Sequence, residues 1–156
     1  MRLKESIHIN TPPDVVWQYV GSPDVWSLFH AKARDTRLVS GQGGLIGSRY
    51  EMQLSLGSKK ALSTGQIIDI QIGRLIRLKS TLEPEPGREV SAMLTYELRD
   101  LGTWTKVYEQ IDIDDPHINL FFRLFLRAIT WLITRLGRPS GETSLMKLKR
   151  IIEEDA

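Results

Sequence analysis

The chain has 156 residues, the length of one ordinary domain, and we expect a single domain over residues 1–156. Apolar residues make up 41% of it, charged residues 26%, and the mean hydropathy is −0.21, which excludes intrinsic disorder and a multi-span membrane protein. The chain has no cysteine, so disulfides, thiolate zinc sites and cysteine nucleophiles are excluded. Its three histidines are scattered, and no glycine-rich phosphate or dinucleotide motif occurs, so we expect neither a metal site nor a cofactor.

The net charge of +2 is unevenly distributed along the chain. Residues 1–116 carry 14 basic and 15 acidic side chains, whereas residues 117–156 carry 7 basic and 4 acidic ones. No run of Lys and Arg occurs in the first three quarters, so we expect no nucleic-acid partner. The first ten residues lack the apolar stretch of a signal peptide, which together with the missing cysteines fits a cytoplasmic location.

The opening residues predict a strand followed by two short helices. Apolar and polar residues alternate over the first ten positions, out of pattern only at Glu5. Thr11 is expected to cap the first helix, with Pro12 in its first position and Gly21 near its end. The second short helix is expected over residues 22–29.

Further segments of alternating character predict a sheet of six to seven antiparallel strands, with one covered face and one exposed face. After the opening strand, they cover residues 33–40, 47–56, 61–70, 74–82, 89–98 and 103–113. The proline-rich stretch 83–87 is predicted to be a turn. Because Ile67 and Ile68 are both apolar, the sequence does not tell which side chains of segment 61–70 point inward.

The last forty residues predict a broken helix. Thirteen of the nineteen residues in 118–136 are apolar, and five of the six polar ones fall in a stripe only about 80° wide, with Arg135 outside it. Glycine and proline interrupt the helix at 137–141. A final helical segment then places Leu145, Leu148 and two isoleucines (Ile151 and Ile152) on one face. The order of elements predicts an α+β fold.

Motifs along nearly the whole chain resemble one known family. They are residues 13–17 (PDVVW), 22–26 (SPDVW), Phe29-His30, 47–50 (GSRY), 65–67 (GQI), 73–76 (GRLI), 96–98 (YEL), Gly102 and 145–153 (LMKLKRIIE). In this order and spacing they resemble the START-like, SRPBCC superfamily, which includes polyketide cyclases, aromatases and lipid-transfer proteins. The resemblance implies a helix-grip fold, in which a curved sheet wraps a long carboxy-terminal helix over an apolar cavity. It transfers no catalytic residue to this chain.

Two features depart from the family pattern. The break at 137–141 replaces a continuous terminal helix, which puts the shape of the cavity mouth in question. Gln71-Ile72-Gly73 stands where the family usually has a pair of prolines before the next strand.

The strand alternation predicts which side chains line the cavity. The expected ligand-binding residues are Tyr50, Met52, Leu54, Ile76, Leu78, Leu94, Tyr96, Val107 and Glu109, with Phe125 from the long helix. Glu109 occupies a position that alternation makes apolar, so we expect its pKa to be raised or its carboxyl to have a partner. It is a candidate to bind a polar ligand head or to act as a general base; alternatively, the strand bulges or the site is wet there. Tyr50 and Tyr96 offer hydroxyls within an apolar wall, or simply belong to the core.

Three functions fit these patterns. The first is binding of a lipid-, polyketide- or isoprenoid-like ligand without catalysis. The second is a cyclase, aromatase or dehydratase that uses Glu109 or a cavity tyrosine, although the sequence reveals no convergent acid–base pair. The third is an interaction module in which the wide apolar surface of helix 118–136 forms a homodimer contact, in preference to a membrane-surface contact.

Overall fold

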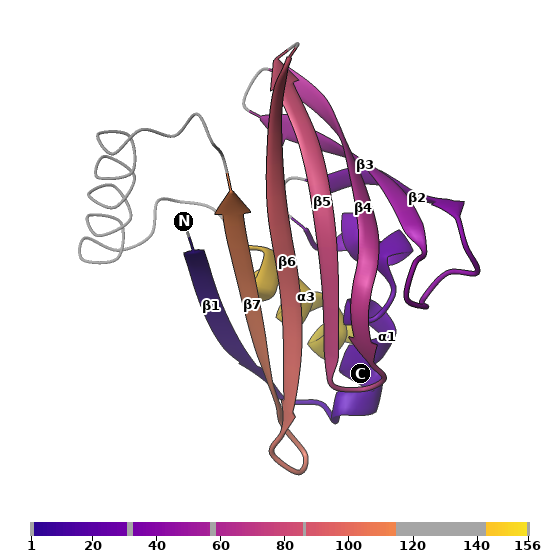
Figure 1. Cartoon of the computed structure of the whole chain (residues 1–156). Coiled ribbons are helices and arrows are strands. Elements are labelled where there is room, and N and C mark those ends of the chain that lie inside the picture. Colours follow the sequence, from indigo (N-terminus) through magenta and orange to yellow (C-terminus); the bar gives the residue numbers. More distant parts are fainter. Residues whose placement is uncertain (1, 31–32, 57–58, 86, 115–142, 156) are drawn as a thin grey trace, which may run out of the picture.

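The computed structural model describes residues 2–30, 33–56, 59–85, 87–114 and 143–155. Within them, one curved sheet of seven strands has the order β1-β7-β6-β5-β4-β3-β2, and all neighbouring strands are antiparallel (Figure 1). The strands are β1 (Arg2–Ile9), β2 (Ala33–Ser40), β3 (Arg49–Leu56), β4 (Lys59–Gln71), β5 (Leu75–Glu85), β6 (Arg88–Asp100) and β7 (Thr105–Asp114). Each of the predicted strands is present, with ends displaced by a few residues at most.

The described helices are α1 (Pro13–Val20), the 3-10 helix η1 (Pro23–Leu28) and α3 (Ser144–Asp155). Figure 1 shows the sheet curving around α1 and α3, which lie together on its inner side. There α3 packs on β1, α1 on β6, and η1 on β2. This is the predicted α+β helix-grip arrangement. The predicted helix 118–136, its homodimer or membrane contact, and the break at 137–141 lie outside the described residues.

The core lies between the inner face of the sheet and these helices. The helices supply Val16, Val20, Trp26, Leu145, Leu148 and Ile152 to it, all almost completely buried. The predicted apolar face of the last segment is therefore confirmed. Burial of each large apolar side chain stabilises the fold by roughly 1.5–3 kcal/mol.

The first helix begins one residue later than the sequence predicts. Pro12 has an extended backbone (φ −61°, ψ 155°) and precedes the helix, so Pro13 takes the first helical position. The predicted cap by Thr11 is wrong, because the Thr11 hydroxyl is buried and makes no hydrogen bond in the structure. The Thr11 carbonyl instead accepts a hydrogen bond from the Thr105 hydroxyl at 2.7 Å, which ties the helix start to β7.

The predicted turn at 83–87 is shorter than expected. The strand β5 continues to Glu85, which pairs with Arg88 across a shift of register that begins after Leu82. An irregular stretch of this kind has fewer ladder hydrogen bonds to lose, so it tolerates a proline that a regular strand would not.

A β-bulge explains why the inward residues of β4 are ambiguous in the sequence. The pairing of β4 with β5 shifts between Ile67 and Asp69, which leaves Ile68 as the extra residue. Ile67 is fully buried while Ile68 is exposed, so two consecutive apolar residues serve different faces.

Candidate functional site

Glu109 is a buried carboxyl on the inner face of β7, with only 8% of its surface exposed. The register of the sheet places it directly opposite Tyr96 of β6. The Tyr96 hydroxyl donates a hydrogen bond of 2.6 Å to Glu109 Oε2. Both the burial and the partner that the sequence led us to expect are therefore present.

Aromatic side chains of the η1 region hold Tyr96 in place. The Tyr96 ring is fully buried and meets Trp26 and Phe29 edge-to-face, with ring centroids 5.2 and 6.1 Å apart. The Trp26 indole is itself fixed, because its Nε1–H donates to the Val20 carbonyl at 2.8 Å. Such contacts restrict the ring and aim its hydroxyl at Glu109.

Burial dominates the electrostatics of this pair. It raises the pKa of Glu109; the hydrogen bond from Tyr96 opposes that shift, and the nearby Glu5 charge adds to it. Burial also raises the pKa of Tyr96 well above its usual range, and the Glu109 charge contributes further. A carboxyl with a raised pKa keeps its proton over a wider pH range, so it can donate a hydrogen bond or a proton to a ligand oxygen.

A second carboxyl, Glu5, lies beside this pair and was not identified from the sequence. The β1–β7 register sets Glu5 directly opposite Glu109 on the same face of the sheet, where side chains of paired residues are neighbours. Glu5 is half-buried. The sequence did contain a signal for Glu5, because it is the one polar residue at an apolar position of the opening strand. Glu109 is the corresponding exception in the last strand. The structure thus brings together two carboxyls and a tyrosine that we name the Glu109 cluster (Glu5, Tyr96 and Glu109).

Removing the Glu109 charge is expected to stabilise the protein at neutral pH. Because the pKa of Glu109 is higher in the folded chain than in the unfolded chain, its contribution to stability is complete below the unfolded pKa and is lost as pH rises through the folded pKa. Glu109→Gln removes the charge and keeps an oxygen that accepts the Tyr96 hydroxyl. We expect a higher melting temperature than that of the wild type at neutral pH, with the difference shrinking as the pH falls toward the unfolded pKa. An unchanged or lower value at neutral pH would contradict this.

Asp112 of the same strand provides a control of opposite sign. Its pKa is lowered by hydrogen bonds from Arg2 and Gln110, so its contribution is present above the unfolded pKa and is lost as pH falls through the folded pKa. Asp112→Asn should therefore lower the melting temperature slightly at neutral pH and have no effect at strongly acidic pH. The effect is small because the Arg2–Asp112 ion pair is largely exposed.

The other expected ligand-binding residues are distributed over the inner face. Those that are buried are Tyr50, Met52, Ile76, Leu78, Leu94, Tyr96 and Val107, and Leu54 is half-buried. Phe125 lies outside the described residues. The Tyr50 hydroxyl accepts a hydrogen bond from the Gly44 N–H at 2.9 Å, so it is engaged by the loop before β3. Three strand spacings, roughly 14 Å, separate the strands of Tyr50 and Tyr96, so only Tyr96 joins the Glu109 cluster.

A hydroxyl without a partner lies elsewhere on this face. Ser63 of β4 pairs with Met52 and Leu82, is 1% exposed, and its Oγ makes no hydrogen bond in the structure. A buried polar atom without a partner costs free energy, and a polar ligand atom would remove that cost.

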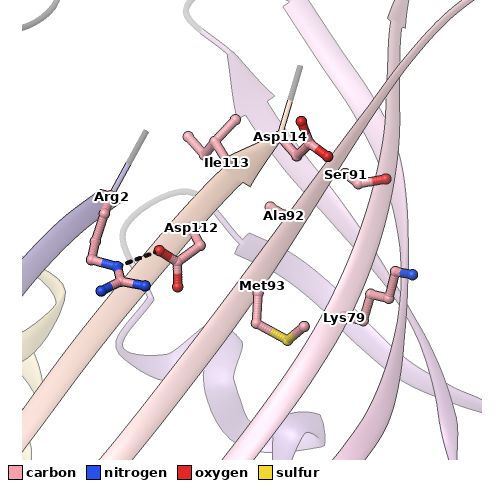
Figure 2. Close-up of a pocket in the computed structure, with 8 residues that line it drawn as sticks. All are labelled: Arg2, Lys79, Ser91, Ala92, Met93, Asp112, Ile113 and Asp114. Atoms are coloured by element: carbon pink, nitrogen blue, oxygen red, sulfur yellow. Dashed lines mark hydrogen bonds and ion pairs between the residues drawn. The ribbon is translucent and has the colours of Figure 1, made fainter. Parts of the chain in front are cut away.

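The outer face of the sheet carries a different kind of hollow. It is a groove of about 470 Å³, in which Arg2 and Asp112 form an ion pair of 2.7 Å. Figure 2 shows this pair and the side chains around it. The lining residues of the groove are Arg2, Lys79, Ser91, Ala92, Met93, Asp112, Ile113 and Asp114. This groove is wide open and mixes both signs of charge, in contrast to the apolar inner face.

The described residues contain no group of three or more His, Asp or Glu side chains placed to hold a metal ion. Nor does this part of the chain include a helix long and apolar enough to cross a bilayer.

The amino-acid sequence matches one known protein family over nearly its whole length. Residues 1–153 match the family described as polyketide cyclase / dehydrase and lipid transport. No curated protein matches the chain in sequence.

Solved structures resemble the chain in fold across almost its whole length. A conserved protein from Geobacillus kaustophilus has a TM-score of 0.71 at 15% identity, covering 99% of this chain and 97% of that one. The Zhui aromatase/cyclase from Streptomyces sp. R1128 has a TM-score of 0.70 at 12% identity, covering 99% and 94%. The major latex-like protein 151 from Panax ginseng has a TM-score of 0.63 at 18% identity, covering 89% and 98%. At these identities the likeness concerns the fold alone.

Proposed function

Because the chain belongs to the polyketide cyclase / dehydrase and lipid transport family, we propose that it binds a small apolar ligand on the inner face of its sheet. The ligand class is lipid-, polyketide- or isoprenoid-like. The observation that carries the proposal is the buried hydrogen bond between Tyr96 and Glu109 on a face lined mainly by apolar side chains. Ligand sites are commonly apolar pockets with a few well-placed polar groups of this kind.

The Glu109 cluster indicates what the ligand carries. The raised pKa of Glu109 makes it easier for the carboxyl to take up a proton when a ligand binds, and in that state it offers an O–H donor. A carbonyl, hydroxyl or ether oxygen is the group that this donor fits. An oxygen-free hydrocarbon would leave that donor unused. The ligand is therefore a mostly apolar molecule with at least one oxygen that reaches β7.

A second candidate function, proton transfer, is supported by Glu5. Two carboxyls of different exposure side by side, one of them with a raised pKa, are an arrangement suited to general acid–base chemistry. Glu109 would give its proton to a ligand carbonyl oxygen, while the Glu5 carboxylate would take a proton from the carbon next to that carbonyl. The product is the enol of the ligand, so the reaction is an enolisation. This step is common to cyclisation and dehydration chemistry.

The binding proposal is tested by native mass spectrometry of the protein purified from its own host, followed by organic extraction. We expect a reproducible copurified ligand in the wild type. Leu94→Trp should displace this ligand, because the added ring fills the space that the ligand occupies, and the protein should stay folded. The matched control is Met93→Trp, at the next residue of β6, which faces the outer groove and should keep the ligand.

Two results would contradict binding. One is a wild type that copurifies with no ligand. The other is unfolding of both Leu94→Trp and Met52→Trp, because overpacking of that kind indicates a solid core.

Catalysis is separated from binding by incubating the extracted ligand with the protein in D₂O. Deuterium incorporation beside a carbonyl that is lost in Glu109→Gln, while ligand binding persists, supports proton transfer. Incorporation that is the same with and without protein leaves binding as the function and rejects the second candidate.

A further inference from the structure

The outer face of the sheet gathers three cations around one aromatic ring. Tyr108 of β7 has Lys4 Nζ, Arg99 Cζ and Lys106 Nζ at 5.3, 4.7 and 5.1 Å from its ring centroid. These cations come from three adjacent strands, β1, β6 and β7. We name Tyr108 with these three side chains the Tyr108 cluster. Each contact is within cation–π range, but the three positive charges repel one another.

The acidic groups near the cluster do not balance it. Tyr108 pairs across the sheet with Ser6 on one side and Glu97 on the other. Glu97 forms an ion pair of 3.5 Å with Arg99. The three cations against the two carboxylates of Glu97 and Asp100 leave a net charge of +1 on this part of the molecule, which favours an anionic partner.

An exposed apolar tip lies next to the cluster. The turn between β6 and β7 is closed by a hydrogen bond from the Leu101 N–H to the Trp104 carbonyl, and the side chains of Leu101 and Trp104 are 52% and 43% exposed. Ile72, on the turn between β4 and β5, is 81% exposed. A hydrogen bond from the Leu98 N–H to the Arg74 carbonyl joins this turn to β6. Both turns therefore lie at the same end of the sheet.

The spacing of tip and cations matches the layers of a membrane surface. Arg99 and Lys106 are paired with each other, two residues behind Leu101 and Trp104, which is roughly 7 Å along the strands. The headgroup layer of a bilayer is roughly 5–7 Å thick on each side. With the tip at the edge of the hydrocarbon, Arg99 and Lys106 would lie at the level of the lipid phosphates.

We propose that the β6–β7 end of the sheet docks on an anionic lipid surface, with Leu101, Trp104 and Ile72 entering the interface and Arg99 and Lys106 of the Tyr108 cluster contacting the headgroups. Tryptophan is favoured at membrane interfaces because its ring is apolar and its N–H is polar. The exposed apolar tip favours a lipid surface over a nucleic acid or an acidic protein, since charge alone would suffice for those. Asp100 at the base of the turn accepts a hydrogen bond from the Gly102 N–H at 2.8 Å, and its negative charge is the one that the neighbouring cations must outweigh. This surface shares no residue with the Glu109 cluster, so the membrane proposal and the proposed ligand binding can be tested independently of each other.

Flotation with lipid vesicles tests the proposal on the full chain. We expect the protein to float with vesicles of phosphatidylcholine and phosphatidylglycerol, and not with vesicles of phosphatidylcholine alone. Each cation near an anionic surface is worth about fivefold in affinity, so the double variant Arg99→Gln/Lys106→Gln should bind roughly 25-fold more weakly. The matched control is Arg77→Gln/Lys79→Gln, which removes the same charge from the outer face of β5 and should stay within about twofold of the wild type.

The contribution of the apolar tip is measured with a second pair of variants. Trp104→Ser should lose most of the binding, whereas Ile46→Ser, an exposed apolar residue in the loop before β3, should retain it. Unchanged melting temperatures would show that all four variants stay folded.

Three results would overturn the proposal. The first is a wild type that does not float with anionic vesicles, and the second is an Arg99/Lys106 double variant that binds like its control. The third is a Trp104→Ser variant that binds vesicles as tightly as the wild type, since that would indicate a purely electrostatic surface suited to another polyanion.

Discussion

Replacing Trp26 with alanine is expected to lower the free energy of unfolding by about 3–5 kcal/mol, because a large buried aromatic ring leaves a cavity that the fold fills only in part. Trp26 is fully buried, contacts the Tyr96 ring, and donates its Nε1–H to the Val20 carbonyl. The variant therefore loses apolar burial and a hydrogen bond at once, and it frees the Tyr96 ring that aims at Glu109. Urea denaturation of the wild type and the variant measures the difference.

Trp104→Ala is the matched control for this measurement. The same chemical change at an exposed position is expected to alter the free energy of unfolding by no more than about 0.5 kcal/mol. Equal losses in the two variants would contradict the packing described for Trp26.

Leu78 and Gly65 form the second pair with large expected effects. Leu78 is fully buried, and Leu78→Ala is expected to cost about 2–5 kcal/mol. A Cβ atom on Gly65 would lie 2.6 Å from Leu78 Cδ2, closer than real contacts allow, so Gly65→Ala is expected to cost about 1–3 kcal/mol by overpacking. In the double variant the added methyl group enters the space that Leu78 vacates, so the double loss should be smaller than the sum of the single losses.

A double-mutant cycle in urea measures this coupling. Thr64→Ala, at the neighbouring exposed position of β4, is the control for alanine in this strand and should be additive with Leu78→Ala. Additive losses for Gly65→Ala and Leu78→Ala would show that the two residues do not compete for the same space.

The sequence was sufficient for much of the fold because strand alternation is a local signal. Buried and half-buried positions alternate from Thr105 to Glu109 of β7, and the alternation of residue types along this strand alone singled out Glu109. The bulge at Ile68 and the extension of β5 through Pro84 could not be read in this way. Both depend on the pairing of one strand with another, which alternation does not encode.

The candidate site shows the same limit of local signals more sharply. Glu5 and Glu109 are 104 positions apart in the sequence, and the pairing of β1 with β7 makes them neighbours. The cations around Tyr108 could not be grouped from the sequence for the same reason. Lys4, Arg99 and Lys106 form no run in the sequence, and they come together through the pairing of three strands. Each residue could be identified alone, but the constellations required the register.

The strand order also governs when the Glu109 cluster can form during synthesis. Strands β2 to β7 pair consecutively, so each can join the sheet as it leaves the ribosome. The strand β1 is made first, yet its partner in the sheet of the described residues is β7, so it must wait for more than half of the chain to follow. Contacts of such long sequence separation form slowly, because the loop between them must first be closed. The nascent chain therefore spends most of its synthesis with Glu5 unplaced, and the two carboxyls meet among the last events of folding.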